Sequence, residues 1–221
     1  MQKHVSASVA PQRPLWLVIL AAGLICGIAM GLRQVMGLYL PPMTSELGIG
    51  REPFSTAMAV ANLTWGIGAV LAGMVADRYG AGRVVLSGVL ATMAGMYLMY
   101  AAQTGLDLLI SGILLGIGVS GTGITSLIGA VGRAAPADKR TSALASLGMA
   151  GGIGGFVAFP YTHLLMDVAG WKLSLLMLML TTSLMLPLAW PLSGTTAATA
   201  TGLSEAQTLS AAIREAFSHG S

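Results

Sequence analysis

Charged side chains are scarce in this chain: Lys, Arg, Asp and Glu together make up 9% of its 221 residues. Soluble domains usually carry about 25% charged residues, so this composition excludes a water-soluble globular domain. The charges sum to only +3 and are scattered, which excludes the clustered basic surface of a nucleic-acid-binding protein. The single cysteine, Cys26, excludes an internal disulfide. Apolar surface of this extent must face lipid or other apolar helices.

Six stretches are apolar and long enough to cross a bilayer, which takes about 20 residues of helix. They cover residues 15–39, 54–76, 84–102, 108–132, 142–166 and 173–192. Arg33 is the one charged residue inside any of them. Backbone polar groups in lipid must be satisfied within the segment, so each stretch must be helical. The sequence therefore predicts an all-α integral membrane protein with six transmembrane helices, a domain that covers residues 15–192.

The basic residues between these stretches predict the orientation of the chain. Eight of them fall on one side and two, Arg51 and Lys172, on the other. The eight are Lys3, Arg13, Arg78, Arg83, Arg133, Lys139, Arg140 and Arg214. Because basic residues favour the cytoplasmic side, both termini are expected in the cytoplasm of a multi-pass cell (plasma or inner) membrane protein. Residues 1–14 would form a cytoplasmic tail, residues 193–202 a linker, and residues 203–221 an amphipathic cytoplasmic helix.

Arg33 is the sharpest candidate for a functional residue. A charge within a span costs about 2.5–3.5 kcal/mol on insertion scales, so such residues usually face a cavity. Gly23, Gly27 and Gly31 form a stripe suited to close helix packing, and at ~100° per residue Arg33 points away from that stripe. One interpretation is a ligand for an anionic substrate, because a guanidinium matches a carboxylate. The other is a side chain that reaches out to the nearby membrane interface.

Asp and Glu are absent from all six stretches. A carrier of cations, or one that couples to protons through its own carboxylate, would need a buried acid. An anionic substrate therefore suits Arg33 better. Proton coupling would have to use the substrate, His163 or a group outside this chain. No cofactor or metal is expected, and no catalytic pair that would make the protein an enzyme is visible.

Asn62 and Trp65 share one face of the second stretch. A buried amide beside an aromatic ring could line a substrate path. An interhelical hydrogen bond with ordinary packing would explain the same pattern. Both interpretations stay open, and with Arg33 these two residues form the predicted substrate site.

The connection between the second and third stretches carries the most specific motif, formed by Gly73, Ala76, Asp77, Arg78, Gly80 and Arg83. These six residues match, and their spacing resembles, the G-x-L-[AG]-D-R-x-G-R-R-[RK] signature of the major facilitator superfamily. Gly73 is expected to let helices approach, Gly80 to make the turn, and the two arginines to anchor at the interface. Val75 departs mildly, and Ala81 and Gly82 replace two basic residues, so the charge contacts of this loop are expected to be weaker than usual.

The resemblance implies a fold of two six-helix halves, each built from two inverted three-helix repeats. It implies that Asp77 helps to lock the cytoplasmic side against the second half. The string Gly31–Leu32–Arg33–Gln34 with Pro41 and Pro42 is similar to carriers related to the monocarboxylate and oxalate types. A basic residue of the first helix handles the substrate anion there, and its counterpart would be Arg33.

These observations predict a secondary transporter that works by alternating access on a small organic anion such as a monocarboxylate. This chain would be the first half of such a carrier and would supply one wall of the site. A missing second six-helix half, or a second copy, is the expected partner, together with the lipid bilayer. The alternative is a non-transporting membrane protein, either an assembly subunit or a degenerate truncated remnant.

Overall fold

The computed structural model of the protein describes residues 14–194. The predicted cytoplasmic tail, residues 1–14, lies outside this range except for Pro14. The predicted linker, residues 193–202, is described only at its first two positions, and the predicted amphipathic helix, residues 203–221, lies wholly outside it. These three assignments stay predictions.

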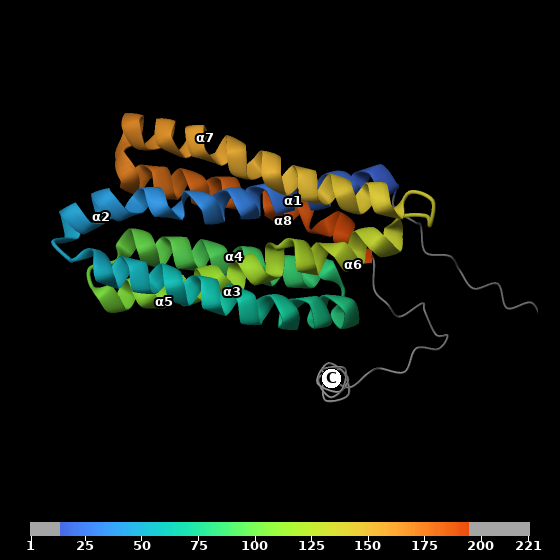
Figure 1. Cartoon of the computed structure of the whole chain (residues 1–221), viewed down its shortest axis with the longest axis horizontal. Helices are drawn as coiled ribbons and strands as arrows, with labels where there is room; N and C mark the ends of the chain where they lie inside the picture. Colours follow the sequence, from blue (N-terminus) through green and yellow to red (C-terminus); the bar gives the residue numbers. More distant parts are fainter. Residues whose placement is uncertain (1–13, 195–221) are drawn as a thin grey trace, which may run out of the picture.

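The described part of the chain is helical throughout and contains no strand (Figure 1). Its elements are α1 (Leu15–Val35), the 3-10 helix η1 (Met36–Tyr39), α2 (Leu40–Leu47), α3 (Arg51–Tyr79), α4 (Ala81–Ala101), α5 (Gly105–Thr122), α6 (Ile124–Ala134), α7 (Arg140–Ser183), α8 (Met185–Leu188) and η2 (Trp190–Gly194). The long helices lie nearly parallel in one bundle. The prediction of an all-α multi-pass membrane protein is confirmed.

Five helical stretches among the described residues are long and apolar enough to cross a membrane, against the six predicted. They are Leu15–Leu47, Arg51–Tyr79, Ala81–Ala101, Gly105–Ala134 and Arg140–Ser193. The difference arises in the last stretch, which covers the fifth and sixth predicted helices in one. The six-helix count is therefore not confirmed by span length.

The long helix α7 contains a sharp break. Its backbone leaves the helical region at Gly170 (φ 75°, ψ 168°), where two helices meet at a kink. A positive φ of this kind is readily adopted by glycine, which has no Cβ. The Tyr161 hydroxyl lies 2.9 Å from the Thr181 hydroxyl, although twenty residues of unbroken helix would span about 30 Å. The chain therefore folds back at Gly170, and Figure 1 shows the two arms of α7 side by side.

The first stretch continues beyond its predicted end at Tyr39. Pro41 and Pro42 stand in the first turn of α2, where a helix does not need their missing N–H groups. The helix ends at Gly48, whose φ of 63° is left-handed. Glu46, which lies beyond the predicted end of the first stretch, is therefore helical.

Close backbone contact joins the helices in three main pairs: α1 with α7, α3 with α5, and α4 with α5. The glycine stripe of α1 packs closely on another helix, as predicted, and that helix is α7: a Cβ on Gly31 would lie 2.8 Å from both the Ala158 Cβ and the Gly154 carbonyl oxygen. A Cβ on Gly154 would overlap the backbone of Gly27, and one on Gly27 would lie 3.0 Å from the Ala150 carbonyl oxygen. Small residues stabilise helix pairs in lipid because they allow this approach.

Helix α3 is the least covered of the long helices. Within the described chain 6% of its apolar window is buried, against 56% for the stretch that begins with α1. Its exposed side chains include Leu63, Ile67, Val70 and Leu71. The uncovered face must contact lipid or another protein surface.

Candidate functional site

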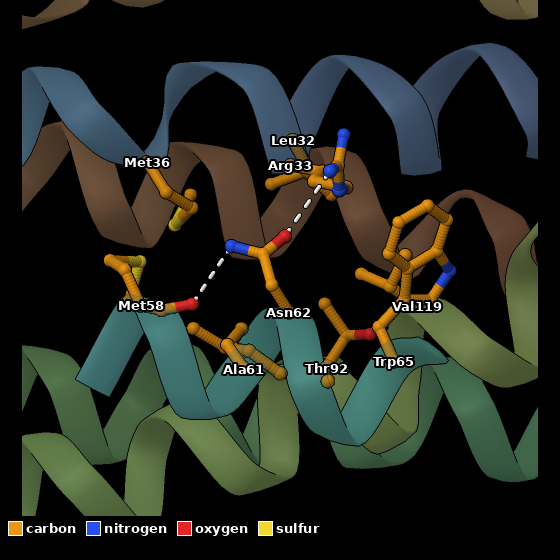
Figure 2. A pocket seen from close by; sticks show the side chains of 11 residues that line it. Leu32, Arg33, Met36, Met58, Ala61, Asn62, Trp65, Thr92 and Val119 are labelled. Atoms are coloured by element: carbon orange, nitrogen blue, oxygen red, sulfur yellow. Dashed lines mark hydrogen bonds between the residues drawn. The ribbon is translucent and has the colours of Figure 1, made fainter. Parts of the chain in front are cut away.

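Arg33 lies on the face of α1 that turns away from α7, as the glycine stripe predicts. Its Nη2 donates a hydrogen bond of 3.2 Å to the Asn62 Oδ1. Its Cζ lies 4.3 Å from the centre of the Trp65 ring, a cation–π contact. Figure 2 shows Arg33 above Asn62, with Trp65 to one side. The three residues of the predicted substrate site are thus brought together, although no observation tests their role in binding.

The Asn62 amide is held in one orientation. Its Nδ2 donates a hydrogen bond of 2.9 Å to the Met58 carbonyl oxygen, one turn earlier in α3. The amide oxygen is therefore left to face Arg33, as Figure 2 shows. An amide oxygen beside a guanidinium offsets part of its desolvation without neutralising its charge.

The guanidinium is far from the ends of the bundle. Trp65 is the central residue of α3 (Arg51–Tyr79), so the ring beneath the guanidinium lies about 21 Å from either end of that helix at 1.5 Å per residue. A side chain at the membrane interface would lie nearer a helix end, about 15 Å from the middle of a bilayer core that is about 30 Å thick. The structure therefore favours the cavity-facing interpretation of Arg33.

A cavity of about 180 Å³ opens beside this cluster. It is lined by Leu32, Arg33, Met36, Met58, Ala61, Asn62, Trp65, Thr92, Leu115, Gly116 and Val119. Ligand pockets for drug-sized molecules are usually about 300–1,000 Å³, so this one suits a smaller molecule. Its wall is mostly apolar, with one cation and one amide that could fix the orientation of a ligand.

Arg33 has no carboxylate partner among residues 14–194. The ion pairs in this range join Arg133 to Asp77, Lys172 to Glu46 and, more loosely, His163 to Asp167. A guanidinium has five N–H donors, and Asn62 accepts from one of them. A positive charge at mid-bundle with unfilled donors is an arrangement that an anion can complete.

The residues of the predicted signature loop gather at the opposite end of α3 from Arg51. Gly73, Asp77 and Arg78 lie in α3, Gly80 (φ 93°) joins α3 to α4, and Arg83 lies in the first turn of α4. Only glycine adopts such a φ without strain, so the predicted turn at Gly80 is confirmed. The Arg78 guanidinium packs over the neighbouring Tyr79 ring at 5.4 Å.

Two features of this loop were not predicted. Asp77 accepts a hydrogen bond of 2.8 Å from Arg133 at the end of α6, an ion pair within this chain that a count of loop charges does not reveal. Gly73 was expected to allow close helix contact, but a Cβ there would meet nothing within 4 Å. That expectation was wrong for the helices of the described chain.

Sequence reasoning also missed the floor of the cavity. Thr92 comes from α4, and Leu115, Gly116 and Val119 come from α5. Gly116 lets α5 approach α3, since a Cβ on it would lie 2.8 Å from the Thr64 Cβ and 3.1 Å from the backbone nitrogen of Trp65. Glycine density along α5 was the available signal, but it does not say which glycine borders a cavity.

Comparison with known proteins identifies the family. The profile of the Major Facilitator Superfamily matches residues 19–220. The 4-hydroxybenzoate transporter PcaK of Acinetobacter baylyi (strain ATCC 33305 / BD413 / ADP1) is 31% identical over 177 residues, which are 74% of this chain and 38% of that protein. The chain belongs to the major facilitator superfamily.

Solved structures show the same fold. The peptide transporter POT in complex with sulfate matches with a TM-score of 0.66 and 20% identity over 95% of this chain and 46% of that one. A bacterial homolog of the human lysosomal transporter Spinster, inward-facing and unoccupied, matches with a TM-score of 0.69 and 16% identity over 96% of this chain and 50% of that one. The chain thus spans half or less of the length of these relatives.

Proposed function

We propose that this chain forms the first six-helix half of a secondary transporter that carries a small organic monocarboxylate by alternating access. The observation that carries the proposal is the Arg33 guanidinium. It is held at mid-bundle by Asn62 and Trp65, beside a mostly apolar cavity, without a carboxylate partner in residues 14–194. Membership of the family indicates that the protein is a transporter. The Arg33 guanidinium beside the cavity indicates that the substrate is an anion.

Six crossings are part of the proposal. The fold-back at Gly170 divides α7 into two antiparallel arms and supports a fifth and a sixth helix in place of one. The helix pairs support two inverted repeats. Counted as six spans, α1 with α7 pairs the first with the fifth, and α3 with α5 pairs the second with the fourth. If spans one to three are exchanged with spans four to six, the first–fifth pair becomes the fourth–second pair.

The distribution of basic residues, eight against two, supports cytoplasmic termini at a cell membrane. A labelling experiment tests this orientation and the count of spans together. In a Cys26→Ser background, Ser6→Cys and Ser193→Cys should both react with a membrane-impermeant maleimide only after the cells are opened. Labelling of one position from outside intact cells would require an odd number of spans and contradict the proposal.

The substrate is proposed to be an anion because the six apolar stretches of the sequence hold one cation, Arg33, and no acid. A guanidinium binds a carboxylate through two parallel charge-assisted hydrogen bonds. The relative from A. baylyi is named for 4-hydroxybenzoate, an aromatic monocarboxylate whose carboxylate could pair with Arg33 at the edge of the cavity. That compound is therefore the first probe. Coupled protons would travel with the substrate, through His163 or through a group outside this chain.

The other wall of the site would come from a second six-helix half or from a second copy of the chain. Helix α3, which carries Asn62 and Trp65, is almost uncovered in this chain. Facilitator carriers bind their substrates between two halves near the bilayer midplane. An uncovered α3 beside the cavity supports such an arrangement.

Binding tests the proposed role of Arg33 directly. The chain in lipid nanodiscs should bind radiolabelled 4-hydroxybenzoate, and the uncharged 4-hydroxybenzamide should not compete. Hydrogen bonds to charged groups contribute about 1.5–3 kcal/mol, so Arg33→Ala should weaken binding roughly 10- to 150-fold. Arg51→Ala, a matched control at the exposed end of α3, should leave affinity unchanged. Equal affinity of wild type and Arg33→Ala would overturn the proposal.

An uptake assay in vesicles distinguishes half of a carrier from a non-transporting membrane protein. Vesicles with this chain alone should show no 4-hydroxybenzoate uptake, and co-expression of a second six-helix half should restore it. Binding that depends on Arg33 supports the carrier assignment. Uptake by the purified monomer would contradict the half-carrier proposal, and absence of any anion binding would favour an assembly subunit or a remnant.

A further inference from the structure

We infer that Gln34 is a second polar contact of the Arg33 site and selects monocarboxylates that carry a hydroxyl group. This inference rests on the proposed function and deepens it. Gln34 follows Arg33 directly in α1, and both side chains are exposed on the surface of the bundle. Arg33 turns toward α3, where it meets Asn62 and Trp65, whereas Gln34 turns toward α7, where it lies on Gly155. The two side chains thus flank the exposed face of α1.

Gly155 leaves space for the Gln34 amide. A Cβ added to Gly155 would overlap the Nε2 of Gln34 and would lie 2.9 Å from its Cδ and 3.3 Å from its Oε1. All three of the nearest atoms belong to this one amide. The amide therefore lies against the bare backbone of α7 with its nitrogen nearest, in space that any other residue at 155 would fill.

Gly37 leaves the face between the two side chains open. Gly37 follows Arg33 by four positions and Gln34 by three. It therefore lies about one helical turn further along the chain, on the side where these two residues are adjacent. A Cβ on Gly37 would meet nothing within 4 Å. The Arg33 guanidinium and the Gln34 amide thus lie on the exposed side of the bundle, where Gly37 at the start of η1 adds no side chain.

The Gln34 amide has hydrogen-bonding capacity to offer. Within residues 14–194 its side chain makes no hydrogen bond, whereas Asn62 already bonds to the Met58 carbonyl and to Arg33. A glutamine amide can donate two hydrogen bonds and accept two. A hydroxyl on the substrate can donate to the amide oxygen or accept from the amide nitrogen. With the carboxylate on Arg33, a ligand that lies across α1 would present its hydroxyl to Gln34.

This arrangement predicts a preference for 4-hydroxybenzoate over benzoate. A site that hydrogen-bonds a hydroxyl rejects the analogue that lacks it, because its polar group is then left unpaired. One neutral hydrogen bond near the surface corresponds to a preference of roughly threefold to tenfold. The preference should come from Gln34, while the affinity for both compounds should come from Arg33.

The test measures the affinities of the chain in nanodiscs for both compounds and takes their ratio. Gln34→Ala should bring the ratio close to one, mainly by weakening 4-hydroxybenzoate. Gly155→Ala should do the same with Gln34 intact, because the new methyl group displaces a flexible amide and meets no backbone. The double variant should show no further loss, since both changes act on one contact. Gln103→Ala, which removes the same side chain from the α4–α5 connection, should leave the ratio as in wild type.

The outcomes distinguish this inference from the proposed function. Arg33→Ala should weaken both compounds and leave their ratio nearly unchanged. If both compounds bind through Arg33 and the ratio does not respond to Gln34→Ala or Gly155→Ala, the role of Gln34 is wrong and the proposed function stands. If neither compound binds to the wild type, or if binding does not depend on Arg33, the inference about Gln34 and the proposed function are both wrong.

Discussion

Replacement of Gly154 by alanine adds one methyl group at the tightest point between α1 and α7. A Cβ at this position would lie well under 3.0 Å from the carbonyl carbon, the oxygen and the Cα of Gly27. Because these are backbone atoms, no side chain can rotate away. Carbon atoms pack best at about 3.5–4.0 Å, so the two helices would have to separate by about 1 Å. Gly152, two residues earlier on the same helix, would meet nothing within 4 Å.

The pair of variants isolates the energy of close packing. Alanine in a helix is favoured over glycine by about 1 kcal/mol, and this gain applies equally to Gly154→Ala and Gly152→Ala. Overpacking of a tight contact costs about 1–3 kcal/mol. Gly154→Ala should therefore weaken the packing of α1 against α7 by about 1–3 kcal/mol relative to Gly152→Ala. Gly152→Ala itself should be neutral or stabilising.

Cys26 provides the assay. It is the one cysteine of the chain, it is buried, and its Sγ lies 3.2 Å from the place of a Cβ on Gly151, within the same α1–α7 contact. The rate at which a maleimide labels it reports how often this contact opens. Gly154→Ala should label roughly 5- to 150-fold faster than Gly152→Ala. Equal rates for the two variants would refute the packing argument.

Three further predictions concern single contacts, each checked by thermal unfolding or binding. Glu46 of α2 bonds to both Trp171 and Lys172 of α7, so Glu46→Gln should lower the unfolding temperature slightly, as expected for an exposed pair, while Glu52→Gln should not. Gly80→Ala should destabilise by about 1–3 kcal/mol, because a side chain at φ 93° is strained; no change would contradict that geometry. Trp65→Leu should weaken 4-hydroxybenzoate binding more than Trp65→Phe, which keeps an aromatic face for Arg33.

The sequence sufficed for the class of fold and for the three central side chains of the site. Length and apolarity predict membrane helices because lipid leaves the backbone no other solution. Arg33 could be oriented because the glycine stripe marks the opposite face of its helix. Asn62 and Trp65 could be placed near it as polar and aromatic residues on one face of the next helix. Each of these inferences uses a local pattern along one helix.

Features that depend on contacts between helices could not be read in this way. The partner of Asp77 is Arg133, 56 residues away, and nothing in the spacing selects it from the other arginines. Thr92 and Leu115 line the cavity, yet apolar and small residues in a membrane helix look alike whichever way they face. The extension past Pro41 was missed because proline usually ends a helix, although it is tolerated in the first turn.

The contact between Arg33 and an anion can be measured as a distance. In bilayers of the ¹⁵N-arginine-labelled chain saturated with carboxyl-¹³C 4-hydroxybenzoate, solid-state NMR dipolar recoupling should give a carbon–nitrogen distance of about 4 Å, since a paired guanidinium and carboxylate bring N and O to about 2.7–2.9 Å. Arg33→Lys should abolish this coupling. A saturated ligand without any such coupling, or a coupling that persists in Arg33→Lys, would contradict the account.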